Sequence, residues 1–187
     1  ATALGVSGPA VETVRLGGLL HDLGKIGVPD RVLLKPGPLT REEFEFIRGH
    51  PAIGAQIVRP LGPFSAPEPV VLHHHERLDG RGYPAGLRGT QIPLAARIVA
   101  VSDAFDAITS DRPYRGGQSS EVALQVLRDG RGAQWDPDAV DAFTQAYAGG
   151  EPDEVVADTK SSGAGAADDR SAGDGSGTER RNAAPRT

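Results

Sequence analysis

The chain has 187 residues, a formal net charge of −5, 38% hydrophobic residues and no cysteine. No apolar run reaches the roughly 18 to 20 residues of a membrane span and no signal peptide opens the chain, so we expect a cytoplasmic protein. The charge does not indicate binding to DNA or RNA. Without cysteine, disulfides and thiolate ligands are excluded, so any metal must be held by nitrogen and oxygen.

The first half of the chain is expected to be helical. Apolar residues at spacings of three and four predict a helix over residues 10–23, whose apolar face ends at a His-Asp pair. Thr40 and Glu43 form a capping box for the next helix. Pro51 suits the first turn of a further helix. Residues 70–75 predict a short buried helix that delivers histidines at its end.

The second half begins with a glycine-rich loop over residues 76–91, which has too many turn residues for regular structure. Residues 93–109 predict a central helix, because they are apolar on nearly all sides. Two more helices follow, one from Ser119 or Ser120 to Gly130 and one from Asp136-Pro137 to near Gly149. No convincing alternating strand appears, so the expected class is all-α.

Composition divides the chain into two predicted parts. Residues 1–148 are expected to form one domain. Residues 149–187 contain no aromatic residue, leucine or isoleucine, and are expected to be a disordered, low-complexity tail. The chain has no methionine, even at position 1, which favours a piece of a longer polypeptide.

The five histidines fall in three short runs, around His21, His50 and His73 to His75, and the run Asp103-Ala104-Phe105-Asp106 follows them. Imidazoles and carboxylates in such runs are what a site with more than one divalent metal needs. The sequence therefore predicts a metal-dependent hydrolase.

Each candidate ligand also has a structural interpretation. His21 and Asp22 point about 100° apart on a helix; they either form a capped helix end, or straddle a cluster in which the two oxygens of Asp22 bridge two ions. The triple histidine is either a solvated helix end or a ligand segment, with His74 and His75 as ligands and His73 structural.

Two carboxylates on the most apolar helix need compensation, because burying an unpaired charge is costly. A metal would compensate Asp103, whereas Asp106 instead caps, pairs with an arginine or orients a ligand histidine.

Lys25 is either a charge at a helix end or a contact to a substrate phosphate. Arg112 and Arg115 are surface residues by default, and phosphate clamps if a metal centre lies beside them. Tyr83 is a turn aromatic or a platform for stacking on a base.

Taken together, these motifs resemble the HD-GYP family, a branch of the HD-domain phosphohydrolases. The resemblance runs from about Val14 to Phe143 and keeps the family's motif order. It rests on His21-Asp22-Leu23-Gly24-Lys25, Lys35-Pro36-Gly37, His50, His74-His75-Glu76, Asp79-Gly80-Arg81-Gly82-Tyr83-Pro84, Arg97-Ile98, Asp103 to Ala107, Asp111-Arg112-Pro113-Tyr114 and Trp135-Asp136-Pro137.

The resemblance implies an HD-domain helical bundle around two or three divalent ions, usually iron or manganese, that hydrolyses the bacterial second messenger cyclic di-GMP to pGpG and often to GMP. Carried over by motif, one ion has the ligands His21, Asp22 and Asp103, and Asp22 bridges to a second ion held by His50, His74 and His75. Asp22 and Lys25 would be the catalytic residues, with Lys25 neutralising charge on the phosphate.

By the same resemblance, Lys25, Tyr83, Arg112 and Arg115 would contact the dinucleotide. The Gly82-Tyr83-Pro84 loop would also bind partner proteins such as diguanylate cyclases, which carry GGDEF domains.

One departure from the family concerns the start of the chain. Family members have helices before the His-Asp pair that supply a further histidine, or a glutamate and a histidine. Only 20 residues precede His21 here and none is histidine, so we expect either a truncated piece of a longer regulator or an incomplete first metal site. Missing helices would leave apolar residues of 10–23 partly exposed.

Two alternatives to a cyclic di-GMP phosphodiesterase stay open. One is a signalling module that binds a cyclic dinucleotide or a cyclase without turnover. The other is an HD phosphohydrolase acting on another nucleotide.

Overall fold

Helices make up the regular structure of this protein. The computed structural model describes residues 1–111 and 116–150, which belong to one unit, Ala1–Pro152. No strand occurs in these ranges, so the all-α class expected from the sequence is confirmed. The α-helices of the described residues are α1 (Pro9–Leu20), α2 (Asp30–Leu33), α3 (Arg41–Val58), α4 (Glu68–His73), α5 (Leu94–Thr109), α6 (Ser120–Asp129) and α7 (Pro137–Ala148). Short 3-10 helices are η1 (Thr2–Leu4), η2 (Leu23–Gly27), η3 (Arg59–Phe64) and η4 (Gly89–Gln91).

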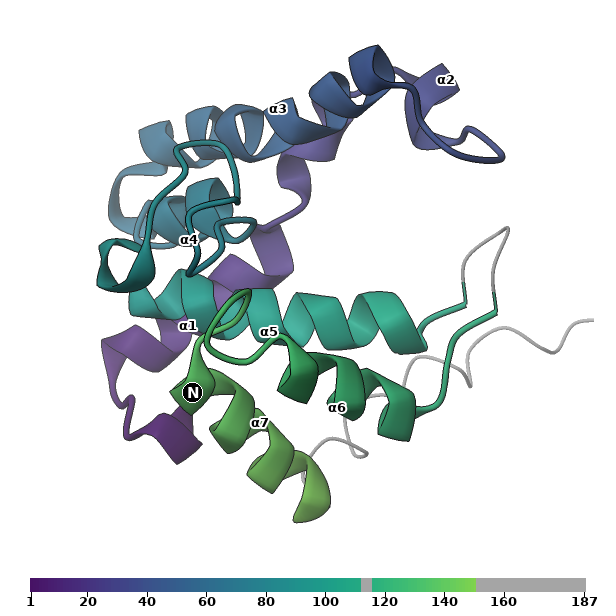
Figure 1. Cartoon of the computed structure of the whole chain (residues 1–187). Coiled ribbons are helices and arrows are strands. Elements are labelled where there is room, and N and C mark those ends of the chain that lie inside the picture. The colour runs from purple at the N-terminus through teal and green to yellow at the C-terminus, as the bar shows by residue number, and fades with distance from the viewer. Residues whose placement is uncertain (112–115, 151–187) are drawn as a thin grey trace, which may run out of the picture. The chain divides into compact units, whose positions relative to one another are not determined.

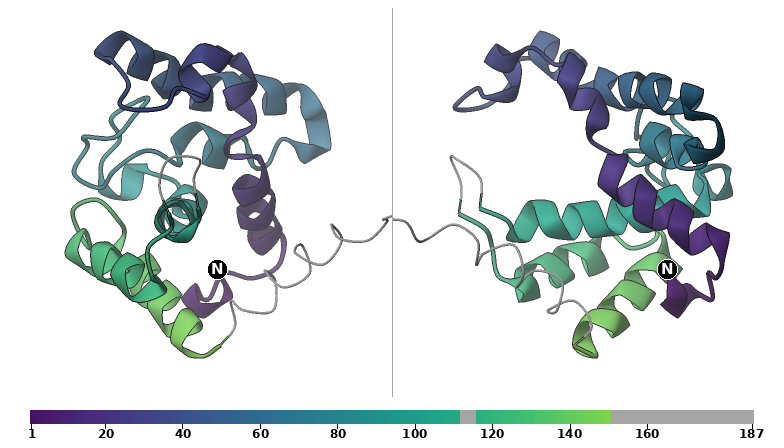
Figure 2. Two further views of the ribbon diagram at one scale, coloured as in Figure 1. Left: turned by 90° about the vertical axis from the view of Figure 1, so that its right-hand side faces the viewer. Right: turned by 180° about the vertical axis from the view of Figure 1, so that it is seen from behind.

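Helix α5 is the central element. It contacts α1, α4, α6 and α7, and in Figure 1 it runs between α4 above and the pair α6 and α7 below. Its buried residues Ile98 and Val101 pack with Leu127, Trp135 and Val140 in the core. The first residues of the chain cover this core from one end, where η1 lies against α7 (Figure 2). The expectation of a central helix over residues 93–109 is confirmed.

The second group of packed elements consists of η2, α3 and α4. Gly24 in η2 lies directly against α3: a Cβ atom there would be 1.9 Å from the carbonyl oxygen of His50 and 2.5 Å from the amide nitrogen of Gly54. Only glycine permits this approach. The close packing brings the residues on both sides of Gly24, Asp22 and Lys25, to the part of α3 that carries His50.

Side-chain caps begin the helices where the sequence predicts them. At α3 the Glu43 amide donates to Thr40 Oγ1 at 3.2 Å, and the Thr40 amide donates to Glu43 Oε2 at 2.7 Å, which completes the capping box. Ser119 caps α6 and Asp136 caps α7. Asp136 also forms an ion pair with Arg97 of α5, which ties the two helices together.

The expectation that Pro51 opens a separate helix is wrong. Helix α3 continues through Pro51 to Val58. Proline has no N–H and would leave the carbonyl of Ile47, four residues earlier, without its helical partner. The Nδ1–H group of His50 donates to that carbonyl at 2.7 Å instead. The helix therefore tolerates the proline because a histidine side chain replaces the missing donor.

Other differences from the expectations are smaller. Helix α1 ends at Leu20 rather than residue 23, and α2 was not expected. Among the described residues, no helix combines the length and apolarity that crossing a membrane requires. The expected boundary between 1–148 and 149–187 stays a prediction, because residues 151–187 are outside the described part.

Candidate metal centre

The predicted ligands come from four places in the fold. They are His21 and Asp22 after α1, His50 in α3, His74 and His75 after α4, and Asp103 on α5. One ligand atom from each of Asp22, His50, His74 and His75 lies within 4.8 Å of all the others. Such a cluster of nitrogen and oxygen atoms, drawn from separate elements, is suited to a divalent cation.

The carboxylate of Asp22 faces two groups of side chains. Its Oδ1 atom lies 3.4 Å from His50 Nε2, and its Oδ2 atom lies 3.4 Å from His21 Nε2. His21 Nε2 is also 3.5 Å from Asp103 Oδ1. Asp22 is therefore shared between a group with His21 and Asp103 and a group with His50, His74 and His75, which is the arrangement a bridging carboxylate requires.

Three of the histidines are held by the same kind of hydrogen bond. The Nδ1–H groups of His21, His50 and His74 donate to backbone carbonyls three residues earlier, at 2.6, 2.7 and 2.8 Å. The carbonyls are free because α1 and α4 end nearby and because α3 contains Pro51. Each bond fixes the tautomer that leaves Nε2 as the metal-binding atom.

The Nε2 atoms of His50 and His74 are 3.3 Å apart. With Nδ1 protonated, neutral rings direct two lone pairs at each other, which is repulsive unless a cation is present. Burial lowers the pKa of His74 to about 3 and, with neighbouring charges, that of His75 to about 4, and burial also lowers the pKa of His50. These histidines are therefore neutral at pH 7, the form that binds metal.

In the group around His21 the pKa of the histidine is raised rather than lowered. Burial disfavours its charged form, but hydrogen bonds to Asp103 and Asp22 together outweigh this and raise the pKa of His21 to about 10. Burial likewise opposes ionisation of Asp22, yet hydrogen bonds from His21 and Lys25 lower its pKa. In the metal-free protein a proton on His21 compensates the two carboxylates, and a cation would take over that role.

Lys25 is part of the same cluster. Its Nζ atom lies 2.5 Å from Asp22 Oδ2. The lysine side chain is 37% exposed, so the ammonium group is accessible to a solute. It is placed to neutralise an anion bound beside Asp22.

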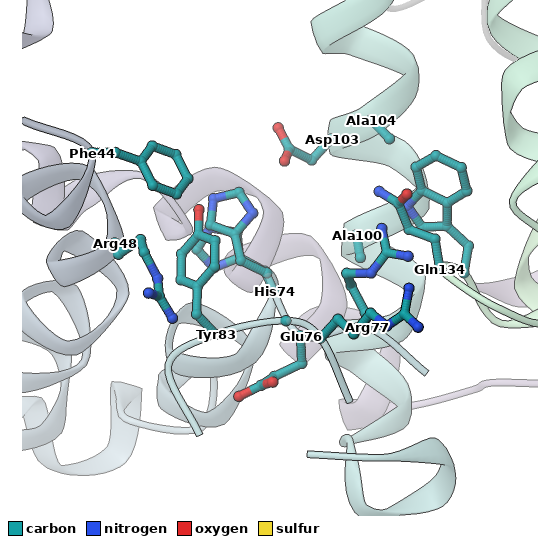
Figure 3. Close-up of a pocket in the computed structure, with 14 residues that line it drawn as sticks. Phe44, Arg48, His74, Glu76, Arg77, Tyr83, Ala100, Asp103, Ala104 and Gln134 are labelled. Atoms are coloured by element: carbon teal, nitrogen blue, oxygen red, sulfur yellow. The ribbon is translucent and has the colours of Figure 1, made fainter. Parts of the chain in front are cut away.

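A cavity of about 450 Å³ opens beside His74, His75 and Asp103 (Figure 3). Besides the predicted site residues His74, His75, Tyr83 and Asp103, it is lined by residues that sequence reasoning did not assign to the site, among them Phe44, Arg48, Arg77, Arg81 and Gln134. Arg77 is held by Asp79 and Arg48 by Glu45. The only available signal was the position of these arginines, two residues before His50 and within the run that follows His75. Guanidinium groups beside a metal centre suit a phosphate-containing substrate.

The remaining predicted residues are not all in the cluster. Asp106 accepts a hydrogen bond from Ser110 Oγ at 3.0 Å and lines a second cavity of about 350 Å³, together with His21 and Asp103. His73 lies apart from the ligand group, with Nδ1 3.7 Å from Glu76 Oε1. Arg112 and Arg115 lie outside the described residues.

Comparisons of this chain with family models, curated proteins and solved structures indicate the same family. The model of the HD domain family matches residues 1–139. The chain is 45% identical over 155 residues to the cyclic di-GMP phosphodiesterase response regulator RpfG of Xanthomonas campestris, and 44% over 147 residues to a cyclic di-GMP phosphodiesterase of Thermotoga maritima. It is 38% identical over 133 residues to the 3'3'-cGAMP-specific phosphodiesterase 3 of Vibrio cholerae.

These matches cover 79%, 76% and 71% of this chain but only 40%, 39% and 29% of the three relatives. The chain thus spans well under half the length of the proteins it resembles. Among solved structures, the HDG"Y"P protein Bd1817 of Bdellovibrio bacteriovorus superposes with a TM-score of 0.63 over 79% of this chain and 47% of that one, at 24% identity. This likeness concerns the fold.

Proposed function

Because this chain belongs to the HD domain family, and to its HD-GYP branch, we propose that it is the metal-dependent phosphodiesterase domain of a bacterial regulator, with cyclic di-GMP as substrate and pGpG or GMP as product. The observation that supports this most is the carboxylate of Asp22, whose two oxygens face His50 and His21 at 3.4 Å each. The choice of cyclic di-GMP as substrate is supported by the relatives that are named as cyclic di-GMP phosphodiesterases.

The residues that would hold the metal ions are His21, Asp22 and Asp103 for one, and Asp22, His50, His74 and His75 for the other. When bound, a pair of divalent ions lowers the pKa of a water molecule and polarises a phosphate. Without thiolate ligands the set of nitrogen and oxygen donors suits iron or manganese, the usual metals implied by the family resemblance.

The protein's own groups would do three things around those ions. The Nδ1 hydrogen bonds of His21, His50 and His74 keep their Nε2 atoms directed at the metal site before an ion binds. The ammonium group of Lys25, at 2.5 Å from Asp22, would bind the phosphate and stabilise the negative charge that develops on it. Arg48 and Arg77 would raise the local concentration of the anionic substrate.

The test is anaerobic hydrolysis of cyclic di-GMP by this chain loaded with Fe²⁺ or Mn²⁺, followed by chromatography of the products. We expect pGpG or GMP from the wild-type chain and none from Asp22→Ala. Asp138→Ala, which removes an exposed carboxylate on α7, is the matched control and should remain active.

Two other outcomes would lead to different functions. Hydrolysis of 3'3'-cGAMP but not of cyclic di-GMP would favour the activity named for the Vibrio cholerae relative. Binding of a cyclic dinucleotide without turnover, with metal bound, would favour a signalling module. Contact between the Gly82-Tyr83-Pro84 loop and a diguanylate cyclase, and a cytoplasmic location, stay predictions.

A further inference from the structure

His75 differs from the other ligand histidines in what holds its ring. His21, His50 and His74 are each anchored by an Nδ1 hydrogen bond, whereas the ring of His75 forms no hydrogen bond with any residue that the structure describes. It is surrounded by rings instead. The centroid of His74 lies 4.0 Å away and that of Tyr83 lies 4.8 Å away, with the Tyr83 ring tilted by 36°.

The backbone of the Gly82-Tyr83-Pro84 segment is packed against the residues that carry His75. The Tyr83 amide donates to the His75 carbonyl at 3.2 Å. A Cβ atom on Gly82 would lie 2.4 Å from the Arg77 nitrogen and 2.5 Å from Glu76 Cα, so only glycine allows the segment to come this close. This close packing fixes the position of the Tyr83 backbone relative to His75.

The buried carboxylate of Glu76 binds the residues that follow the Gly82-Tyr83-Pro84 segment. The side chain of Glu76 accepts hydrogen bonds from the amides of Ala85 at 2.7 Å and Leu87 at 3.0 Å. Glu76 directly follows His75, so the segment on both sides of Tyr83 is tied to the residues next to the ligand.

The Tyr83 ring also has partners on α3. The guanidinium carbon of Arg48 lies 5.5 Å from the ring centroid, and Phe44 meets the ring edge-to-face at 6.4 Å. In Figure 3, Arg48 lies beside Tyr83 on the side away from His74. The ring is thus in contact with protein groups on α3 as well as with His75.

We propose that Tyr83 is a positioning residue for His75: its ring takes the place of the missing Nδ1 hydrogen bond and keeps the imidazole directed at the metal centre. This inference rests on the metal centre of the proposed function but not on the identity of the substrate. It assigns the conspicuous Gly82-Tyr83-Pro84 loop an internal role.

The test is Mn²⁺ binding to the substrate-free chain, measured by isothermal titration calorimetry. Tyr83→Phe keeps the ring and should retain the wild-type affinity. Tyr83→Ala should raise the Kd about tenfold or more, the effect typical of removing a group that orients a ligand. The KM for cyclic di-GMP, measured with Mn²⁺ at saturating concentration, is the second readout.

The opposite pattern overturns the proposal. Wild-type Mn²⁺ affinity in Tyr83→Ala, together with a raised KM, would make Tyr83 a contact to the substrate. If no form of the chain hydrolyses cyclic di-GMP, the proposed function fails, but the Mn²⁺ comparison still decides the role of Tyr83.

Two further variants separate positioning from general stability. Tyr83→Leu keeps apolar bulk without a flat ring, and it decides the question if circular dichroism shows that Tyr83→Ala is unfolded; wild-type Mn²⁺ affinity in Tyr83→Leu would then overturn the proposal. Tyr147→Ala removes a tyrosine from α7 that packs on Phe105, and it should lose stability without losing Mn²⁺ affinity.

Discussion

The Nδ1–H group of His50 donates to the carbonyl of Ile47 at 2.7 Å, at the position in α3 where Pro51 cannot supply an N–H group. The proline therefore does more than interrupt a ladder of hydrogen bonds. It keeps an acceptor available for the ring of a ligand histidine, whose Nε2 atom is then directed at Asp22 and His74.

Pro51→Ala tests this relationship. Alanine restores an amide that competes with His50 for the Ile47 carbonyl, so the Kd for Mn²⁺ should rise severalfold. The free energy of unfolding of the metal-free chain should change little, because the helix gains about 3 kcal/mol in propensity but loses about 1.6 kcal/mol from the buried ring and about 1 to 3 kcal/mol from the buried His50 N–H group that loses its acceptor.

Calorimetry and urea denaturation measure the two effects separately. Pro137→Ala, at the start of α7, is the control and should leave Mn²⁺ binding unchanged. An unchanged affinity in Pro51→Ala would mean that the carbonyl does not orient His50.

The two aspartates of α5 provide a matched pair. Asp103 lies 3.5 Å from His21 Nε2, whereas Asp106 accepts a hydrogen bond from Ser110. Asp103→Asn removes a charged ligand while keeping the shape, so we expect a rise of about tenfold or more in the Kd for Mn²⁺. Asp106→Asn should bind Mn²⁺ as the wild type does. Equal losses in both variants would contradict the assignment of Asp103 alone.

Local signals in the sequence were sufficient for most helices. Capping residues such as Thr40, Ser119 and Asp136 act within one turn, so their patterns predict where helices begin. Proline at position 51 gave the wrong boundary because a histidine side chain compensates it, and residue type alone does not reveal such compensation.

The candidate ligands could also be selected by type, because clustered histidines and aspartates together are typical of metal sites. The hydrogen bonds that orient them could not, because each depends on where a helix ends relative to one carbonyl. The lining of the cavity was missed for a related reason: Arg48 and Gln134 are far apart in sequence, and only the fold brings them to one cavity.

Glu76→Gln should destabilise the protein. The Glu76 side chain is buried, and both of its oxygens accept backbone amides, from Ala85 and Leu87. An amide group offers one oxygen and turns its NH₂ group toward the other donor, which leaves a buried N–H unpaired. We expect the free energy of unfolding to fall by about 2 kcal/mol.

Urea denaturation of the metal-free chain measures this loss. Glu68→Gln is the control, because Glu68 pairs with the exposed Arg59 and its removal should cost only about 0.5 kcal/mol. Similar costs in the two variants would show that Glu76 does not hold the loop.

The ion pair between Arg77 and Asp79 should make stability depend on pH. Hydrogen bonds from Arg77, at 3.1 and 2.6 Å, lower the pKa of Asp79 from 3.8 to about 2. Since the folded pKa is below the unfolded one, the charged form stabilises the fold; the contribution is complete well above pH 4 and disappears as the pH falls through 2.

Asp79→Asn should therefore lower the free energy of unfolding by about 1 kcal/mol at pH 7, after allowance for solvent screening of a surface pair, and by about half as much at pH 3. Urea denaturation of both chains at the two pH values is the measurement. A difference between the chains that grows as the pH falls would have the wrong sign for a depressed carboxyl pKa and would exclude the ion pair as its cause.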